Sequence, residues 1–412
     1  MDWSAILSQV QPILQEVQAD RDKALRRLAK QFDQTELGDL QVDKSLLKAA
    51  ESKIAPELKE AIDVAYANIH AFHKAQLRPV SKIETMPGVN CWRKAVPIQS
   101  VGLYVPGGTA PLFSTVLMLG IPAMLAGCPN ICLCTPARNN EPIHPALLYA
   151  AHKVGIEQLF QIGGAQAIAA MTFGTETVPK VDKLFGPGNQ YVTAAKQLAQ
   201  DYKVAIDMPA GPSEVAIWAD ATSTPAFVAA DLLSQAEHGP DSQVLLVSTD
   251  RQLIDLVKME VERQVKELPR EDMARKSLAN SLLVCFDAKE EALAFVDAYA
   301  AEHLIIATDT AAEDAERITQ AGSIFIGQWT PESAGDYASG TNHTLPTDGY
   351  ARMYSGVSLD SFYKMITYQE ISEEGLQHLG PYVEVMAEAE GLRGHKNAVT
   401  LRLKALQAPT ES

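Results

Sequence analysis

Four short stretches of the sequence combine residue types that can hold a metal ion or transfer a proton. In the first, Ser-Gln-Ala-Glu-His-Gly-Pro at 234–240, Gln235 and His238 stand three residues apart at the end of an apolar, helix-like run. On a helix they project from one face, where an amide oxygen and an imidazole can ligate one cation. A histidine at the end of a helix also serves as a cap for the last carbonyl groups. The spacing alone leaves both interpretations open.

Two further stretches contain groups that transfer protons. Glu302 and His303 come just before an apolar run typical of a strand, and a carboxylate beside an imidazole supplies two proton-transfer groups. Such neighbours are also common without any catalytic role. The polar stretch 332–343 contains Asp336 and His343 and is typical of a long loop. Loops of this kind often carry functional groups, and a solvated surface loop explains the pattern equally well.

The fourth stretch, 390–397, places Glu390 and His395 around two glycines and is typical of a plain turn. Together with Gln235 and His238, one residue from each of the stretches 332–343 and 390–397 would complete a mixed nitrogen and oxygen set that suits Zn²⁺. That set is Gln235, His238, Asp336 and His395. Nothing in the spacing shows that the four converge, so a metal site requires a fold that brings them together.

The elements that must position these residues follow an alternating pattern. From about residue 97, short β-rich runs alternate with Ala- and Leu-rich runs of helical length, which is typical of parallel sheets with helical connections. Glycine-rich turns at 106–108 (Pro-Gly-Gly), 163–164 and 186–189 follow strands, where open α/β sheets bind ligands. None is the fingerprint G-x-G-x-x-G, so glycine alone does not indicate a dinucleotide. The predicted strands are 100–105, 130–135, 158–162, 181–185, 214–219, 243–248, 282–286, 304–307 and 323–326.

The sequence therefore predicts an α/β protein with two Rossmann-like parallel-sheet domains, a helical N-terminal segment and a small C-terminal segment. The C-terminal pattern is helical at 358–372 and 373–391, with a break at Gly380-Pro381, and ends in a β-like run at 398–403. The predicted boundaries are 1–96 for the helical N-terminal segment, 97–220 for the first α/β domain, 221–357 for the second α/β domain with its active-site loop, and 358–412 for the helical C-terminal segment.

Composition excludes several classes of partner. The 412 residues carry 35 Lys+Arg against 51 Asp+Glu, and a net charge of −16 disfavours nucleic acid as a partner. The uncharged stretch 115–134 is interrupted by glycines and prolines, which favours a buried helix and strand over a membrane span. The first residues lack the pattern of a signal peptide, and five cysteines suggest reduced thiols. We expect a cytoplasmic protein without a membrane partner.

Taken together, the motifs resemble those of the histidinol dehydrogenase family. The most specific is Ile-Asp-Met-Pro-Ala-Gly-Pro-Ser-Glu at 206–214, followed by Leu-Leu-Ser-Gln-Ala-Glu-His at 232–238. The resemblance extends in register from about residue 20 to residue 403. Supporting motifs are Gly-Leu-Tyr-Val-Pro-Gly-Gly at 102–108, Gly-Gly-Ala-Gln-Ala at 163–167, Phe-Gly-Pro-Gly-Asn at 185–189, the stretch 333–343, and His-Lys-Asn-Ala-Val at 395–399.

The resemblance implies an activity and a set of cofactors. A member of this family oxidises L-histidinol to L-histidine through L-histidinal in two NAD-dependent steps, the last of histidine biosynthesis. It binds one zinc ion per subunit and works as a homodimer with shared active sites, to which the C-terminal segment of the partner subunit contributes. In that chemistry zinc need not act as a Lewis acid, because it can hold the substrate's imidazole and amine in place.

The same resemblance assigns roles to individual residues. Glu302 and His303 would be the catalytic acid/base pair, with His303 taking the alcohol proton and Glu302 activating water for the aldehyde step. The implied zinc ligands are Gln235, His238, Asp336 and His395, with His395 from the partner subunit. The implied substrate contacts are Ser213, Gln235, His238, His303, Asp336, Glu390 and His395, and the implied nucleotide contacts are Tyr104, Gln166 and Asn189. Ala301 departs from the family, which usually has proline there.

Three alternatives remain open on the sequence. A dehydrogenase of the same fold could act on another alcohol, such as a sulfonated diol, although a sulfonate calls for a cation that the candidate site lacks. A thiol-based aldehyde dehydrogenase would need a reactive cysteine, and the motifs that carry the polar groups contain none. A non-catalytic scaffold would have little reason to keep the acid/base pair and the candidate ligands together.

Overall fold

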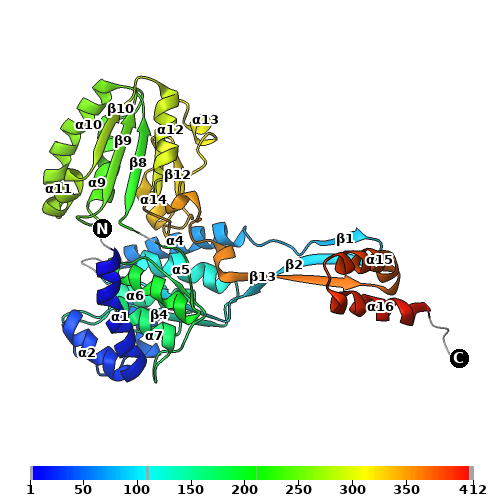
Figure 1. The fold of residues 1–412 in the computed structure, drawn as a ribbon. Coiled ribbons are helices and arrows are strands. Elements are labelled where there is room, and N and C mark those ends of the chain that lie inside the picture. Colours follow the sequence, from blue (N-terminus) through cyan, green and yellow to red (C-terminus); the bar gives the residue numbers. More distant parts are fainter. Residues whose placement is uncertain (1–2, 108–110, 210, 408–412) are drawn as a thin grey trace. The chain divides into compact units, whose positions relative to one another are not determined.

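The computed structural model describes residues 3–107, 111–209 and 211–407. Gly108 and Ala210, which belong to the motifs quoted above, lie outside the described residues. The chain forms two compact units, shown in Figure 1. The larger unit is Met1–Gln76 with Ile98–Phe362, and the smaller one is Leu77–Pro97 with Tyr363–Ser412.

The first sheet of the larger unit has the strand order β5-β4-β3-β6-β7, and neighbouring strands are parallel. Its strands are short and buried, because helices cover both faces of such a sheet. The connecting helices α7 and α8 supply apolar side chains to one core cluster, to which the N-terminal helices also contribute. The elements are β3 (Ser100–Tyr104), α5 (Phe113–Leu125), β4 (Asn130–Cys134), α6 (Pro145–Val154), β5 (Gln158–Phe160), α7 (Gly164–Phe173), β6 (Lys183–Phe185), α8 (Gln190–Ala199), η2 (Gln200–Tyr202) and β7 (Ala205–Ile206).

The second sheet repeats this topology with the order β10-β9-β8-β11-β12, again parallel throughout. Alternate residues of its strands face two separate cores, one toward α9–α11 and the other toward α12 and α13, as Figure 1 shows. The elements are β8 (Glu214–Ala219), α9 (Pro225–Ala236), β9 (Gln243–Ser248), α10 (Arg251–Gln264), η3 (Val265–Glu267), α11 (Glu271–Ala279), β10 (Leu282–Cys285), α12 (Lys289–Tyr299), β11 (His303–Ala307), α13 (Ala311–Ala315) and β12 (Ser323–Ile326).

The remaining elements of the larger unit are helices at the N-terminus and short helices after β12. Helix α1 packs on α7 and α8, and its Val10, Leu14 and Val17 belong to the core of the first sheet. Helix α4 packs on α5. These elements are α1 (Trp3–Asp20), α2 (Asp22–Phe32), α3 (Lys44–Ala49), η1 (Ala50–Lys53), α4 (Pro56–Lys74), α14 (Glu332–Tyr337), η4 (Tyr350–Arg352) and η5 (Leu359–Phe362).

The smaller unit is an antiparallel sheet of order β1-β2-β13 with two helices. The elements are β1 (Lys82–Met86), β2 (Val89–Pro97), β13 (Tyr363–Ile371), α15 (Glu373–Ala389) and α16 (Arg393–Gln407). Many of its apolar side chains are exposed, including Val385 at 71% and Met386 at 66%. A unit of this size buries little apolar surface of its own.

The prediction of two parallel α/β sheets with a helical N-terminus is confirmed. The uncharged stretch 115–134 lies in α5 and β4, as the sequence predicted. Among the described residues, no helix is both long enough and apolar enough to cross a membrane.

Several local predictions were wrong. The N-terminal segment predicted as helical to residue 96 ends in the strands β1 and β2, and residues 363–371 form β13 rather than a helix. Strands β1 and β13 are largely exposed, and β13 pairs with β2 across most of the chain, so no local apolar run marks them. Helix α15 continues through Pro381, because one missing N–H removes only one helical bond. Residues 398–403 lie in α16, which packs on α15.

The predicted boundary between the α/β domains also differs from the structure. It placed 214–219 in the first domain, at 97–220. Strand β8 instead stands at the centre of the second sheet, between β9 and β11. The length of a β-rich run does not reveal which sheet it joins, because strand pairing is a tertiary interaction.

Candidate active site

The candidate acid/base pair, Glu302 and His303, lies at the amino end of strand β11 in the second sheet, beside the amino end of the neighbouring strand β8. His303 is the first residue of β11, and Glu214 is the first residue of the adjacent β8. Open parallel sheets usually bind ligands at the carboxyl ends of their strands. The second sheet departs from that rule, because its candidate acid/base groups lie at the amino ends of the strands.

Backbone contacts fix both members of the pair. The Glu302 carboxylate oxygen Oε2 accepts a hydrogen bond from the Glu214 N–H at 2.9 Å. His303 Nδ1 lies 3.2 Å from the Glu214 carbonyl oxygen, which can only accept, so Nδ1 carries the proton and donates. In the neutral imidazole the lone pair is then on Nε2. This arrangement leaves Nε2 of His303 as the atom that can take a proton.

Helix α14 brings two carboxylates to the same imidazole. Asp336 Oδ1 lies 3.4 Å from His303 Nε2, and Glu332 Oε1 lies 3.9 Å from His303 Nδ1. Candidate ligand atoms of His303, Glu332 and Asp336 all lie within 4.8 Å of one another. Both carboxylate oxygens of Glu332 are buried, and within the described part of the chain neither has a hydrogen-bond partner. The acidic cluster around His303 therefore has more negative groups than the sequence indicated.

Burial and mutual repulsion set the protonation of this cluster. Burial raises the pKa of Glu302 to about 8 and that of Glu332 to about 8, because a charged carboxylate loses its hydration there. Burial alone lowers the pKa of an imidazole, but Glu302, Glu332 and Asp336 outweigh it and raise the pKa of His303 to about 10. Burial also opposes ionisation of Asp336, yet the facing His303 lowers the pKa of that carboxyl. A cation bound at Asp336 would weaken this pairing and free Nε2 as a base.

The two candidate ligands at the end of α9 lie together as predicted. Gln235 Nε2 is 3.1 Å from His238 Nδ1. Gln235 is fully buried, and its Oε1 atom has no hydrogen-bond partner among the residues that the structure describes. A buried amide oxygen without a donor is costly, and a metal ion is one group that would satisfy it. Helix α9 packs on α14, the helix that carries Asp336.

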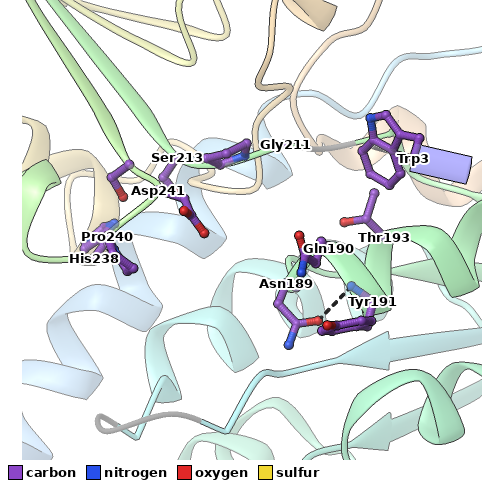
Figure 2. Close-up of a pocket in the computed structure, with 14 residues that line it drawn as sticks. Trp3, Asn189, Gln190, Tyr191, Thr193, Gly211, Ser213, His238, Pro240 and Asp241 are labelled. Carbon is purple, nitrogen blue, oxygen red and sulfur yellow. Dashed lines mark hydrogen bonds between the residues drawn. The ribbon is translucent and has the colours of Figure 1, made fainter. Parts of the chain in front are cut away.

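His238 and Ser213 line a cavity of about 310 Å³ together with residues that follow β6. Figure 2 shows Asn189 and Tyr191 facing Ser213 and His238 across this cavity. Among the described residues that line it, none is a lysine or an arginine. The cavity thus joins a predicted nucleotide residue, Asn189, to predicted substrate and metal residues.

The three predicted nucleotide residues line a second cavity of about 500 Å³. The Tyr104 hydroxyl accepts the Gly164 N–H at 3.0 Å, and Gln166 Nε2 donates to Asp33 Oδ2 at 3.2 Å. The Asn189 side chain caps α8 by accepting the N–H groups of the next turn. Tyr104 ends β3 and Asn189 follows β6, and the strand order reverses between these two strands; Gln166 follows the edge strand β5. The position suits a nucleotide.

The other two predicted residues belong to the smaller unit. Glu390 follows α15, and His395 lies in the first turn of α16. Both are exposed. Their participation in the site stays a prediction.

Sequence reasoning missed Glu214 and Glu332. The signal for Glu332 was its spacing of four residues from Asp336, which places both on one face of a helix. That signal was hidden because the stretch 332–343 was expected to be a loop. Glu214 stands inside the most specific motif, but only its pairing with β11 brings it to His303.

Contacts with α5 fix the loop after α14. His343 Nδ1 donates to the Asp336 carbonyl at 2.8 Å, and its Nε2 lies 3.1 Å from Thr115 Oγ1. Asn342 Nδ2 donates to the Met118 carbonyl at 2.6 Å. These contacts hold the residues around Asp336 against a helix of the first sheet.

Comparison with known proteins decides the family. The model of the family described as histidinol dehydrogenase matches residues 1–403. The chain belongs to the histidinol dehydrogenase family. It is therefore an enzyme, an oxidoreductase, and the resemblance noted in the sequence is confirmed.

Individual relatives agree over nearly the whole chain. Histidinol dehydrogenase of Bacteroides thetaiotaomicron is 56% identical over 407 residues, which cover 99% of this chain and 95% of the relative. The chloroplastic histidinol dehydrogenase of Arabidopsis thaliana is 53% identical over 411 residues, covering 99% and 88%. The crystal structure of histidinol dehydrogenase from Elizabethkingia anophelis has a TM-score of 0.95 and 53% identity, and the match covers 99% of this chain and 96% of that one.

Proposed function

We propose that this enzyme oxidises L-histidinol to L-histidine through L-histidinal in two NAD-dependent steps, the last of histidine biosynthesis. The observation that carries the proposal is the buried Glu302–His303 pair, whose Nδ1–H is held by a backbone carbonyl so that Nε2 is left to accept a proton. Family membership supplies the substrate, and the site supplies groups that match its chemistry.

In the first step, His303 Nε2 takes the proton of the substrate hydroxyl while a hydride leaves the carbon that bears this hydroxyl. In the second step, Glu302 takes a proton from water as the oxygen adds to the aldehyde carbon, and the hydrate loses a second hydride. NAD⁺ supplies the hydride acceptor in each step, so one histidinol and one water yield one histidine and two NADH. Burial raises the pKa of Glu302 to about 8, so its carboxylate form, which predominates above that pH, is a stronger base than a solvated glutamate.

The residues around the site suit a divalent cation. Gln235, His238 and Asp336, with His395 of the partner subunit, would hold one Zn²⁺ per subunit. The unpartnered Oε1 atom of buried Gln235 supports this assignment, and the mixed amide, imidazole and carboxylate set is one that zinc accepts. When bound, zinc would supply direct ligation of the substrate's imidazole and amine. The protein's part is to orient these ligands and to exclude water around them.

We further propose a homodimer in which the smaller unit contributes Glu390 and His395 to the partner's site. The exposed apolar side chains of this unit support it, because large exposed apolar patches mark interaction surfaces. They include Ile83, Tyr382, Val385, Met386 and Leu401. We also propose that the enzyme acts in the cytoplasm, and we note that the plant relative is described as chloroplastic.

The charge of the site favours histidinol over a sulfonated diol. Free histidinol is a cation, which suits a site that contains Glu302, Glu332 and Asp336, and its nitrogen atoms would ligate zinc in their neutral form. A sulfonate would need a facing cation, and the described residues that line the cavity of about 310 Å³ at His238 and Ser213 include no lysine or arginine. The ligand chemistry therefore agrees with the substrate named for the relatives.

The test is the yield of NADH from limiting L-histidinol, measured before chelation, after chelation and after addition of zinc. We expect two NADH per histidinol, lost with the metal and regained with zinc. No NADH from folded, zinc-loaded enzyme would refute the proposed substrate. A yield of one would show that only the alcohol step occurs, and would reject the role assigned to Glu302.

A further inference from the structure

A buried ion pair lies beneath the predicted nucleotide residues. Lys196 Nζ of α8 lies 2.5 Å from Asp207 Oδ1, and the two side chains are only 4% and 1% exposed. Taking two charges out of water is costly, and such a pair is weak evidence for stability by itself. Its hydrogen bonds indicate what it does instead.

The ion pair holds Gly186 by both of its backbone polar groups. Lys196 Nζ donates to the Gly186 carbonyl at 2.8 Å, and Asp207 Oδ2 accepts the Gly186 N–H at 2.8 Å. Asp207 Oδ1 also accepts the Met208 N–H at 2.7 Å. One pair of side chains thus fixes the turn after β6 and the start of the segment that leads to Ser213.

Gly186 occupies a conformation that needs this support. Its φ is +126°, and a Cβ built there would lie 2.1 Å from the Tyr104 carbonyl oxygen. The chain therefore leaves β6 in close contact with the end of β3, and continues through Gly188 to Asn189. Asn189 lines both cavities, and Figure 2 shows it at the edge of the smaller one.

We propose that the buried Lys196–Asp207 ion pair is a positioning device for the dinucleotide site. It holds the Gly186–Asn189 turn in the shape that receives the cofactor, and it ties this turn to the segment that carries Ser213. The proposal rests on the proposed NAD-dependent function. In this proposal neither Lys196 nor Asp207 touches the cofactor, and both act through the turn that they hold.

The test compares this pair with a second ion pair of the same chain, in which only the carboxylate is buried. Lys289 Nζ lies 2.7 Å from Asp314 Oδ1, a carboxylate 2% exposed, which also accepts from Trp218 and Thr308 within the second sheet region. Asp207→Asn and Lys196→Met are the test variants, and Lys289→Met is the matched control. For each we would measure the KM for NAD⁺, the KM for histidinol, kcat, the Kd for NADH, the zinc content and the thermal midpoint.

We expect Asp207→Asn to raise the KM for NAD⁺ and the Kd for NADH by about tenfold or more, because small misplacements of binding groups are costly. The zinc content should change little, and the KM for histidinol should rise by less than the KM for NAD⁺, because only the start of the segment that leads to Ser213 is held by the pair. Lys289→Met should lower the thermal midpoint and leave both dinucleotide constants unchanged. If Lys196→Met fails to fold, the double variant with Asp207→Asn removes the unpaired charge and should fold while still binding NADH weakly.

Two results would overturn the inference. One is a folded Asp207→Asn enzyme, or the double variant, with dinucleotide constants equal to those of the wild type, since the pair would then be only structural. The other is a control variant that loses dinucleotide affinity as much as the test variants do. Wild-type enzyme that binds no NADH would refute the proposed function itself, and the inference with it.

Discussion

Replacement of Glu302 by glutamine should separate the two oxidation steps. The Glu302 side chain accepts the Glu214 N–H, and the glutamine amide oxygen can accept the same bond, so we expect the local backbone to persist. What is lost is the carboxylate that we propose takes a proton from water. His303 and its contact with the Glu214 carbonyl remain, so the alcohol step keeps its proposed base.

The size of the effect follows from the role of the group. A positioned general base raises the rate of a step by a factor of about 10² to 10⁴, which corresponds to about 2.7–5.5 kcal/mol of activation free energy. We expect the rate from L-histidinal to fall by this factor. The rate from L-histidinol to the aldehyde should fall by less than about tenfold, because Glu302 affects that step only through the charge next to His303.

The assay measures single-turnover NADH formation from L-histidinol and from L-histidinal separately. Glu214→Gln is the matched control, because Glu214 is a neighbouring buried carboxylate that accepts the Asp348 N–H at 2.6 Å and has no assigned proton transfer. The Glu214→Gln control should change the rates of both oxidation steps by similar factors. Equal losses in both steps for Glu302→Gln would refute the reasoning and make Glu302 a positioning residue.

Three further predictions test the metal, the dimer and the ion pairs. His238→Ala should lose zinc and activity together, as measured by metal analysis; full zinc occupancy would contradict its role as a ligand. Subunits with His395→Ala, mixed with subunits carrying Glu302→Ala, should regain part of the activity, and verified mixed dimers without recovery would place the site within one subunit. The third prediction concerns Asp63. Burial raises the pKa of this carboxyl, but the hydrogen bonds that it accepts, first that of Lys153 Nζ at 2.6 Å, lower the pKa by more. A carboxyl whose pKa is depressed by folding stabilises the protein above its unfolded pKa, so the stability lost in Asp63→Asn at pH 7 should shrink as pH falls below about 4. Chemical denaturation at several pH values measures this, and a constant difference would contradict it.

The sequence predicted most strands of the two parallel sheets within a residue or two. The run 243–248 and the run 323–326 correspond to β9 and β12 with the same bounds. Such strands are buried on both faces, so each is a continuous apolar run that can be recognised locally. Strand β13 could not be recognised in this way, because it is largely exposed and pairs with β2, far away in the chain.

The residues of the candidate site also fall into two groups, those that local sequence reveals and those that only the fold brings together. Glu302 and His303 are adjacent in the sequence, and Gln235 and His238 share a helix face, so local spacing reveals each pair. Glu332 lies beside His303 only because α14 packs there. The convergence of separate elements cannot be inferred from spacing within any one of them.

What the sequence by itself determined is the family, the two α/β sheets and the residue types available for chemistry, because these depend on local patterns and motifs. Only the tertiary structure decided that β8 joins the second sheet, that Glu302 and His303 lie at the amino edge of this sheet, and that Glu214 and Glu332 lie next to them there. It also decided the protonation of the cluster. The raised pKa of Glu302 comes first from burial, and burial exists only once distant segments have packed together.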